Sequence, residues 1–251
     1  WQLNRAAEWV KDGGGLIIVA ADKSSSFGSK IWYLAYPGGE ARQIITDLSV
    51  YGQLLSLSAD SDSLLAVQAH YQSNIWVAPA ENPANAKQVT FDSLGKINGW
   101  EGLAWMPDGR IIYTARVDES STIWAINADG RNQAQLTPSD GTYAHLSVSP
   151  DADFIVFEAV RSESREIWRV RSYGSDPRQL TSGGKNSQPH VSPDGKWIVY
   201  ISGGGELRRI SIDGGGETLL AEEPALISPR YSPDGKFIAY GAGSNGNLKL
   251  L

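Results

Sequence analysis

The sequence has no cysteine, a single methionine and only three histidines among its 251 residues. Without cysteine the chain can form neither disulfide bonds nor thiolate metal sites. A zinc site needs three or four converging ligands, and strand alternation places His145 and His190 on opposite sides of their strands. We therefore expect no cofactor and no metal site.

The chain also lacks any apolar run near the roughly 18 residues that a membrane span needs. Its formal net charge is −6, and no basic patch stands out. We therefore expect neither direct membrane insertion nor a nucleic-acid partner. The first residue is Trp1 rather than methionine, and no signal-peptide pattern follows it. We interpret the chain as a piece of a larger protein.

Motifs of common enzyme classes are missing as well. There is no Gly-x-Ser-x-Gly string for a nucleophile elbow, and no long segment has a helical apolar period. The glycine runs at 12–15, 202–205 and 213–216 lack the Lys-Ser/Thr ending of a phosphate-binding loop. We expect an all-β chain without catalytic residues.

What the sequence does contain is an internal repeat. The string PHVSPDGKWIVY at 189–200 returns as PRYSPDGKFIAY at 229–240. Weaker copies occur upstream, and their turn aspartates follow one another at intervals of about 40 to 48 residues: Asp12, Asp60, Asp108, Asp151, Asp194 and Asp234. Ser61 and Ala152 stand where the other turns have glycine, so we expect those two turns to be looser or of another type.

Each repeat reads as four short strands. An apolar strand enters the Ser-Pro-Asp-Gly turn, a second strand leaves it, a third begins Ile-Trp, and a fourth ends Gln-Leu-Thr. Four antiparallel strands repeated in this way predict a six-bladed β-propeller. The blades would span about 6–47, 54–91, 102–138, 145–182, 188–221 and 228–251. Residues 1–4 match a fourth strand, so we expect them to complete the last blade.

These turns, with the Ile-Trp strand and the Gln-Leu-Thr ending, resemble the WD-like propeller repeats of TolB over nearly the whole chain. The resemblance implies a single propeller domain and favours a periplasmic or other extracytoplasmic location. Related propellers are appended to bacterial kinases and transmembrane regulators, or cover the active sites of prolyl-oligopeptidase-like enzymes. The resemblance therefore implies that this chain is part of a larger bacterial signalling or cell-envelope protein.

Alternation in the first strand of each repeat suggests a site. The residues two before the turn serine are mostly polar, and the next ones are apolar, so the polar set would line a central channel. That set is Glu8, Ser56, Ala104, Ser147, His190 and Arg230. Glu8, His190 and Arg230 come from consecutive blades and would lie side by side, either as a structural charge pair or as a ligand anchor.

Aromatic residues on the links between blades extend this site. Trp100 lies in the longest link and is not repeated, whereas Trp32, Trp76, Trp124 and Trp168 share one repeat position typical of packing between blades. Tyr143 and His145 lie in an equivalent link. Each of these residues either contacts a ligand or folds into the core of its loop.

We therefore expect a non-catalytic, monomeric recognition or sensory module that binds a protein or a small ligand at its central-channel face. The contact residues would be Glu8, Trp100, Tyr143, His145, His190 and Arg230. One alternative is an accessory propeller that gates substrate entry to a prolyl-oligopeptidase-like hydrolase. Another is a metal-dependent, lactonase-type enzyme.

Overall fold

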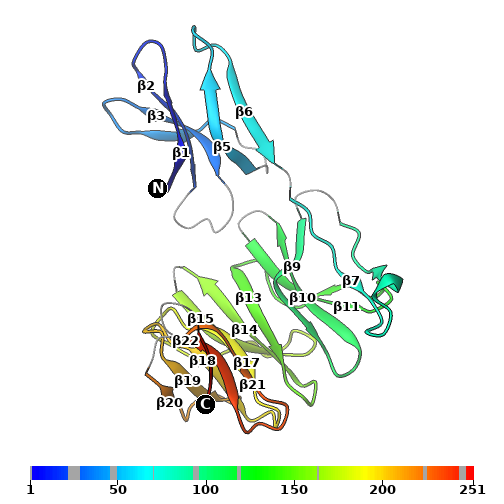
Figure 1. Cartoon of the computed structure of the whole chain (residues 1–251). Helices are drawn as coiled ribbons and strands as arrows, with labels where there is room; N and C mark the ends of the chain where they lie inside the picture. Colours follow the sequence, from blue (N-terminus) through cyan, green and yellow to red (C-terminus); the bar gives the residue numbers. More distant parts are fainter. Residues whose placement is uncertain are drawn as a thin grey trace. The chain divides into compact units, whose positions relative to one another are not determined.

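The computed structural model describes residues 2–21, 29–45, 50–69, 71–92, 96–117, 120–162, 164–222, 225–242 and 247–251. Apart from one short 3-10 turn, η1 (Pro83–Asn85), every regular element in these ranges is a β-strand (Figure 1). The predicted all-β class is confirmed. No helix in the described ranges is long and apolar enough to cross a membrane.

The chain divides into two compact units, which are treated separately below. The first comprises residues 1–72, 92–96 and 117–119, and the second comprises 73–91, 97–116 and 120–251. The first unit holds a four-stranded sheet and a hairpin: β1 (Gln2–Trp9), β2 (Gly15–Ala21), β3 (Lys30–Ala35) and β4 (Ala41–Gln43), then β5 (Val50–Leu57) and β6 (Leu64–Ala69). Ile17, Val19, Ile31 and Tyr51 form its buried core.

The second unit contains the remaining sheets. Its first is the pair β7 (Trp76–Val77) and β8 (Lys87–Gln88). Three four-stranded sheets follow. The first contains β9 (Lys96–Trp105), β10 (Arg110–Val117), β11 (Ser120–Asn127) and β12 (Ala134–Gln135), and the second contains β13 (Thr142–Val148), β14 (Phe154–Arg161), β15 (Ser164–Arg171) and β16 (Arg178–Gln179). The third contains β17 (Ser187–Val191), β18 (Trp197–Ile201), β19 (Leu207–Ser211) and β20 (Thr218–Ala221). The last sheet has three strands: β21 (Ala225–Tyr231), β22 (Ile238–Ala242) and β23 (Asn247–Leu250).

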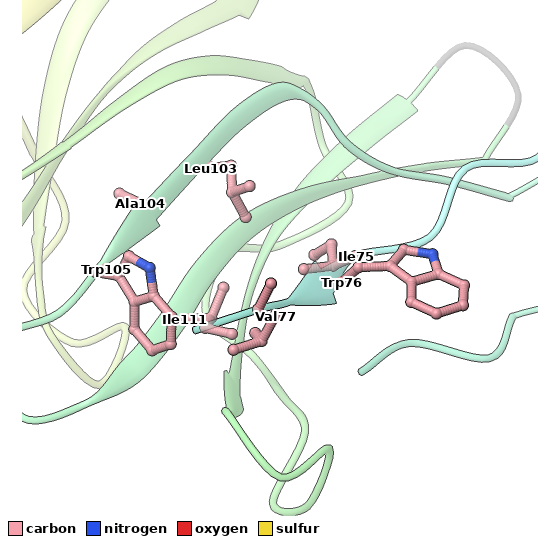
Figure 2. Close-up of a pocket in the computed structure, with 8 residues that line it drawn as sticks. Ile75, Trp76, Val77, Leu103, Ala104, Trp105 and Ile111 are labelled. Carbon is pink, nitrogen blue, oxygen red and sulfur yellow. The ribbon is translucent and has the colours of Figure 1, made fainter. Parts of the chain in front are cut away.

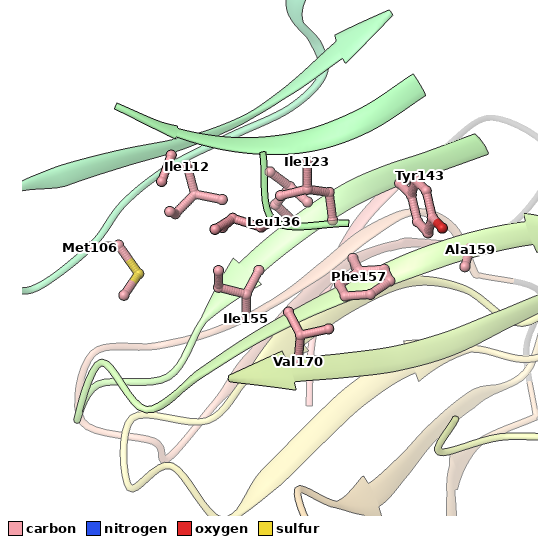
Figure 3. Packing of buried hydrophobic residues seen from close by; sticks show 11 residues of the cluster. Met106, Ile112, Ile123, Leu136, Tyr143, Ile155, Phe157, Ala159 and Val170 are labelled. Carbon is pink, nitrogen blue, oxygen red and sulfur yellow. The ribbon is translucent and has the colours of Figure 1, made fainter. Parts of the chain in front are cut away.

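Neighbouring sheets of the second unit pack through apolar side chains. One cluster joins Met106, Ile112 and Ile123 of one sheet to Ile155 and Phe157 of the next (Figure 3). Two further clusters repeat this contact along the chain. The apolar faces of the predicted strands are therefore buried between sheets.

Six hairpins match the six predicted repeats, and the four turns that contain serine share one side-chain hydrogen-bond pattern. In the fifth turn, Ser192 Oγ donates to Asp194 Oδ1 at 2.6 Å and accepts from the Trp197 amide at 3.0 Å. These bonds hold the aspartate, and they lower its carboxyl pKa. The motif is therefore a side-chain-bonded tight turn.

The expectation of looser turns at Ser61 and Ala152 is wrong. Both residues have left-handed backbone, with φ of 62° and 63°, close to the 72° of Gly195 in the fifth turn. Their amides also bond the turn serine carbonyl, at 2.8 Å for Ser61 and 3.0 Å for Ala152. The surrounding bonds impose the glycine conformation on a residue with a Cβ, which stores strain in these two turns.

This strain can be measured by exchanging residues. Gly195→Ala is expected to lower the free energy of unfolding by about 1 kcal/mol, because alanine disfavours positive φ. A Cβ there would lie 3.6 Å from Pro150 Cδ, an ordinary contact, so the cost is conformational. Ala152→Gly should raise stability by a smaller amount. Urea unfolding of both variants measures these changes. A Gly195→Ala variant that is more stable than the unchanged chain, or an Ala152→Gly variant that is less stable, would contradict the prediction.

The first strands are longer than predicted, and five of them, β1, β5, β13, β17 and β21, continue upstream through a β-bulge. In β1 the register shifts between Leu3 and Ala6, and Gln2 and Leu3 then pair with Ala21 and Ala20 of β2. This corrects the prediction that residues 1–4 supply the fourth strand of the last sheet. Trp1 itself lies outside the described residues. Pairing of the bulged strand with β2 takes up the residues that resemble a fourth strand.

The second repeat departs from the four-strand plan. Its described strands form two separate pairs, β5 with β6 and β7 with β8. The predicted single sheet over 54–91 is therefore not found among the described residues. Four of the other repeats have four strands, and the last has three in the described ranges.

Candidate functional site

The first strands of the second unit are tied to one another by side chains of the predicted polar set. Ser147 Oγ accepts a hydrogen bond from the Val191 amide at 2.9 Å. One sheet further along, His190 Nδ1 accepts from the Tyr231 amide at 3.2 Å. His190 is the repeat counterpart of Ser147, and Arg230 is the counterpart of His190. Each acceptor thus bonds the amide of the residue directly after its counterpart on the next first strand. Part of the polar set holds adjacent sheets together.

The imidazole of His190 is neutral at pH 7. Burial, with a smaller contribution from the nearby Arg230 charge, lowers the pKa of His190 to about 4. Since its Nδ1 accepts the Tyr231 amide, the neutral ring carries its proton on Nε2. His190 therefore presents one N–H donor.

Arg230 lies beside His190 and has few partners. Its Nη1 donates to the Pro229 carbonyl at 2.9 Å, and burial lowers the pKa of its guanidinium. No carboxylate of the described residues forms an ion pair with it. By contrast, Arg116 and Arg165 each pair with a glutamate. Arg230 therefore retains donors that an anion could accept.

His145 belongs to a charged cluster around a buried carboxylate. Glu158 accepts hydrogen bonds from His145 Nδ1 at 2.9 Å and from the Gln188 amide at 3.2 Å, and it forms an ion pair with Arg165 Nε at 3.1 Å. The bulge of β13 gives His145 a φ of 51° and leaves its side chain 42 % exposed. Glu158 therefore orients an imidazole whose other nitrogen is available.

Trp100 lies on an insertion in β9. The Asn98 amide donates to the Ser73 carbonyl, as the Asn186 amide donates to the Arg165 carbonyl. Asn98, however, is two residues further from its turn aspartate, Asp108, than Asn186 is from Asp194. The extra residues are accommodated at Gly99, with φ of 76°, and the Trp100 side chain is 69 % exposed. The insertion explains why this aromatic residue has no repeat equivalent.

A buried ion pair follows Trp100. Glu101 Oε1 accepts from Arg116 Nη1 at 2.5 Å. The next residue, Gly102, packs against β13 so closely that a Cβ there would lie 2.6 Å from Leu146 Cγ. This contact puts Glu101 and His145 at the same level on adjacent strands. The second unit thus brings Trp100, His145, His190 and Arg230 onto consecutive first strands.

Tyr143 does not join this surface. Its ring is fully buried, stacks edge-on against Phe157, and belongs to the apolar cluster of Figure 3. Its hydroxyl donates to Asp140 and accepts from Arg161, and burial raises the pKa of Tyr143 to about 12. Of the two roles that the sequence allowed, the structure places Tyr143 in the core.

Glu8 belongs to the first unit. It lies in β1 opposite Ile17 of β2, and its side chain is exposed. Its membership of the site stays a prediction from the repeat position.

A groove of about 380 Å³ lies beside β9, between Trp105, Leu103 and the β7 residues Trp76 and Val77 (Figure 2). Trp76 is exposed, so its predicted packing is not observed, whereas Trp124 and Trp168 pack against buried clusters as predicted. In later repeats the counterparts of Trp105 pack between sheets: Val148, Val191 and Tyr231. We interpret the groove as a sheet-packing surface.

Comparison with known proteins decides the family. The profile of the TolB beta propeller domain matches residues 93–251, more than half of the chain. The chain belongs to the TolB beta-propeller family. The resemblance inferred from the repeats is confirmed.

Relatives of this TolB-family chain are bacterial. A protein of unknown function from Agrobacterium fabrum is 32 % identical over 105 residues, which cover 41 % of this chain and 35 % of that protein. The match thus spans about a third of the relative. A protein of Agrobacterium tumefaciens described as a candidate TolB has a similar structure, with TM-score 0.55, 21 % identity, and coverage of 94 % of this chain and 89 % of that one.

TolB from Acinetobacter baumannii is also similar in structure. Its TM-score is 0.52 at 17 % identity, and the match covers 98 % of this chain and 51 % of that chain. These two likenesses support the propeller fold of the TolB-family chain and nothing finer.

Several residues that surround the candidate site residues were not singled out from the sequence. Glu158 is the central one, and it interrupts the apolar run of β14 at a position where β18 has Ile201 and β22 has Gly241. A carboxylate within a buried strand needs partners, so this single exception to the repeat was a usable signal. Arg165, Glu101 and Arg116 carry no comparable signal, because each lies toward the end of its strand away from the repeat turn, where charged residues are common in the sequence.

Proposed function

We propose that this TolB-family chain is a non-catalytic recognition module that binds a carboxylate-bearing protein or ligand at the first strands of its second unit. Arg230 and His190 would donate hydrogen bonds to the carboxylate. His145 and Trp100 would contact neighbouring groups, and Glu8, which belongs to the first unit, is not part of this proposal. Tyr143 is left out because its ring is buried.

The observation that carries the proposal is the unpaired guanidinium of Arg230 beside a neutral histidine. Arg230 is exposed and has no carboxylate partner among the described residues, so its guanidinium donors are accessible to an anion. Because its pKa lies at about 4, His190 is neutral at pH 7 and adds no second positive charge beside Arg230. Both side chains offer donors only, which suits a carboxylate.

The exposed indole of Trp100 supports a partner larger than a single ion. Aromatic and arginine side chains are typical anchors of protein interfaces. By the family resemblance we further propose an extracytoplasmic bacterial protein as the setting.

A short acidic peptide tests this proposal. Calorimetric titration with acetyl-Gly-Glu-Gly-Glu-Gly-amide is expected to show saturable binding, and the glutamine version should bind at least about tenfold more weakly, since bonds to a charged group contribute about 1.5–3 kcal/mol. Arg230→Ala should abolish the preference for glutamate. Arg131→Ala, at an exposed arginine in the β11–β12 turn, is the matched control. Equal binding by Arg230→Ala and the unchanged chain would refute the proposal.

A further inference from the structure

Two bulge residues, His145 and Gln188, are linked through one carboxylate oxygen. Glu158 Oε2 accepts from His145 Nδ1 at 2.9 Å and from the Gln188 amide at 3.2 Å, which joins the bulge of β13 to the bulge of β17. Both residues have left-handed backbone, with φ of 51° for His145 and 56° for Gln188. Residues with a Cβ adopt this conformation at a cost, and such positions are concentrated at functional sites. The two bulges therefore hold His145 and Gln188 together at the expense of backbone strain.

The side chains of both residues have an acceptor to spare. Because an ionised carboxylate can only accept, His145 Nδ1 donates to Glu158, and the neutral imidazole keeps a lone pair on Nε2. Gln188 Oε1 is buried and accepts from no donor in the described part of the chain. The residue as a whole is half-buried, so rotation of its last side-chain bonds would bring this oxygen to the surface. Both residues therefore offer an acceptor to a ligand.

Glu101, on the first strand before β13, adds a third acceptor. Its Oε1 accepts from Arg116, whereas its buried Oε2 has no donor among the described residues. The close packing of Gly102 on Leu146 places Glu101 at the level of His145. A buried acceptor without a donor is rare and costly in folded proteins. Three consecutive first strands, β9, β13 and β17, therefore carry acceptors that a ligand could fill.

The free groups of His190 and Arg230 are of the opposite kind. His190 Nε2 and the guanidinium of Arg230 are donors. His190 follows Gln188 by two residues on β17, so their Cα atoms are no more than about 7 Å apart. Donors and acceptors therefore lie next to each other along one strand. A ligand that satisfies both carries hydrogen-bond donors close to its carboxylate.

We propose that the ligand of this site carries a primary ammonium group beside its carboxylate, as at a free amino terminus followed by an acidic residue. This inference rests on the proposed carboxylate site. The ammonium would donate its three N–H groups to His145 Nε2, Gln188 Oε1 and Glu101 Oε2, while Arg230 and His190 bind the carboxylate. An ammonium group has three donors and no acceptor, which matches these three acceptors.

Three forms of one peptide test the proposal. Gly-Glu-Gly-Glu-Gly-amide has a free ammonium group, its acetylated form lacks the charge, and its N-trimethylated form keeps the charge without any N–H donor. In calorimetric titration at pH 7, where an amino terminus is mostly protonated, the free form should bind at least about tenfold more tightly than either of the others. Equal affinity of the free and trimethylated forms would indicate a general attraction to the negative net charge of the chain and would overturn the proposal.

A substitution in the chain locates the ammonium. Gln188→Met removes the acceptor at nearly unchanged side-chain length, and it should reduce the ratio of affinities between the free and acetylated peptides by about 3- to 10-fold. Asn132→Met is the matched control, because Asn132 is an exposed amide with φ of 55° in the β11–β12 turn, and it should keep the ratio. An unchanged ratio in Gln188→Met would overturn the proposal.

The outcomes separate this inference from the proposed carboxylate site. Binding of the acetylated peptide without a gain for the free form overturns the ammonium subsite alone. A chain that binds none of the three peptides overturns both proposals. Circular dichroism checks that Gln188→Met is folded, and the three peptides decide the question on the unchanged chain if it is not.

Discussion

Replacing Glu166 by alanine is expected to lower the free energy of unfolding by about 3–5 kcal/mol. Glu166 is buried, and its carboxylate accepts from Thr181 Oγ1 at 2.7 Å, Asn186 Nδ2 at 2.7 Å and the Gly184 amide at 2.6 Å. Alanine leaves these donors without an acceptor in a site closed to water. The carboxylate thus organises the link that leads from β16 into β17 and His190.

Glu166→Gln separates charge from shape. The amide oxygen keeps one acceptor, but its NH₂ group faces donors, so an intermediate loss of about 2 kcal/mol is expected. Guanidinium unfolding of both variants, read by tryptophan fluorescence, measures the difference. A loss below about 1 kcal/mol for Glu166→Ala would show that the link is held by other contacts.

Acidification is expected to destabilise the chain through His190 by up to about 3 kcal/mol. The folded-state pKa of about 4 lies below the ordinary value of 6.5, so between these values the unfolded chain binds more protons. Stability therefore falls as the pH decreases from about 6.5 to 4. Below pH 4 this contribution no longer changes.

His190→Asn provides the matched comparison. Asparagine Oδ1 can replace Nδ1 as acceptor for the Tyr231 amide without titrating. Stability measured at pH 7 and at pH 4.5 should fall less in His190→Asn than in the unchanged chain. Equal pH dependence in the two proteins would contradict the burial of a neutral histidine.

The repeat allowed the hairpins to be predicted from sequence, because their turns are local. Ser192, Asp194 and Gly195 each have a defined position in the turn, and their bonds reach no more than five residues. Even the exceptions at Ser61 and Ala152 follow the same geometry, since the backbone bonds outweigh the preference of one residue.

Pairing between distant segments was less predictable. Gln2 and Leu3 resemble a fourth strand, yet a bulge lets β1 continue along β2. Short polar strands have weakly specified register, so a four-residue match cannot distinguish the two partners. The prediction of a single four-stranded sheet for the second repeat failed for a similar reason, because the third and fourth strands of that repeat are only two residues each.

The positions of the candidate site residues in the fold could be predicted in part. Alternation identified His190 and Arg230, which the structure places on adjacent strands of one unit. Tyr143 and Trp100 looked alike as link aromatics, but only Trp100 lies on an insertion that exposes it. The length of the link before Trp100 was visible in the sequence, but the position of the extra residues, at Gly99, follows only from aligning the strands through their hydrogen bonds.

Nitrogen-15 NMR of the Arg230 and His190 side chains during titration with the acidic peptide tests the central claim most directly. The carboxylate site predicts that the Arg230 Nε–H and His190 Nε2–H signals shift together, with the midpoint found by calorimetry. Peptide binding that leaves both signals unchanged would contradict the account.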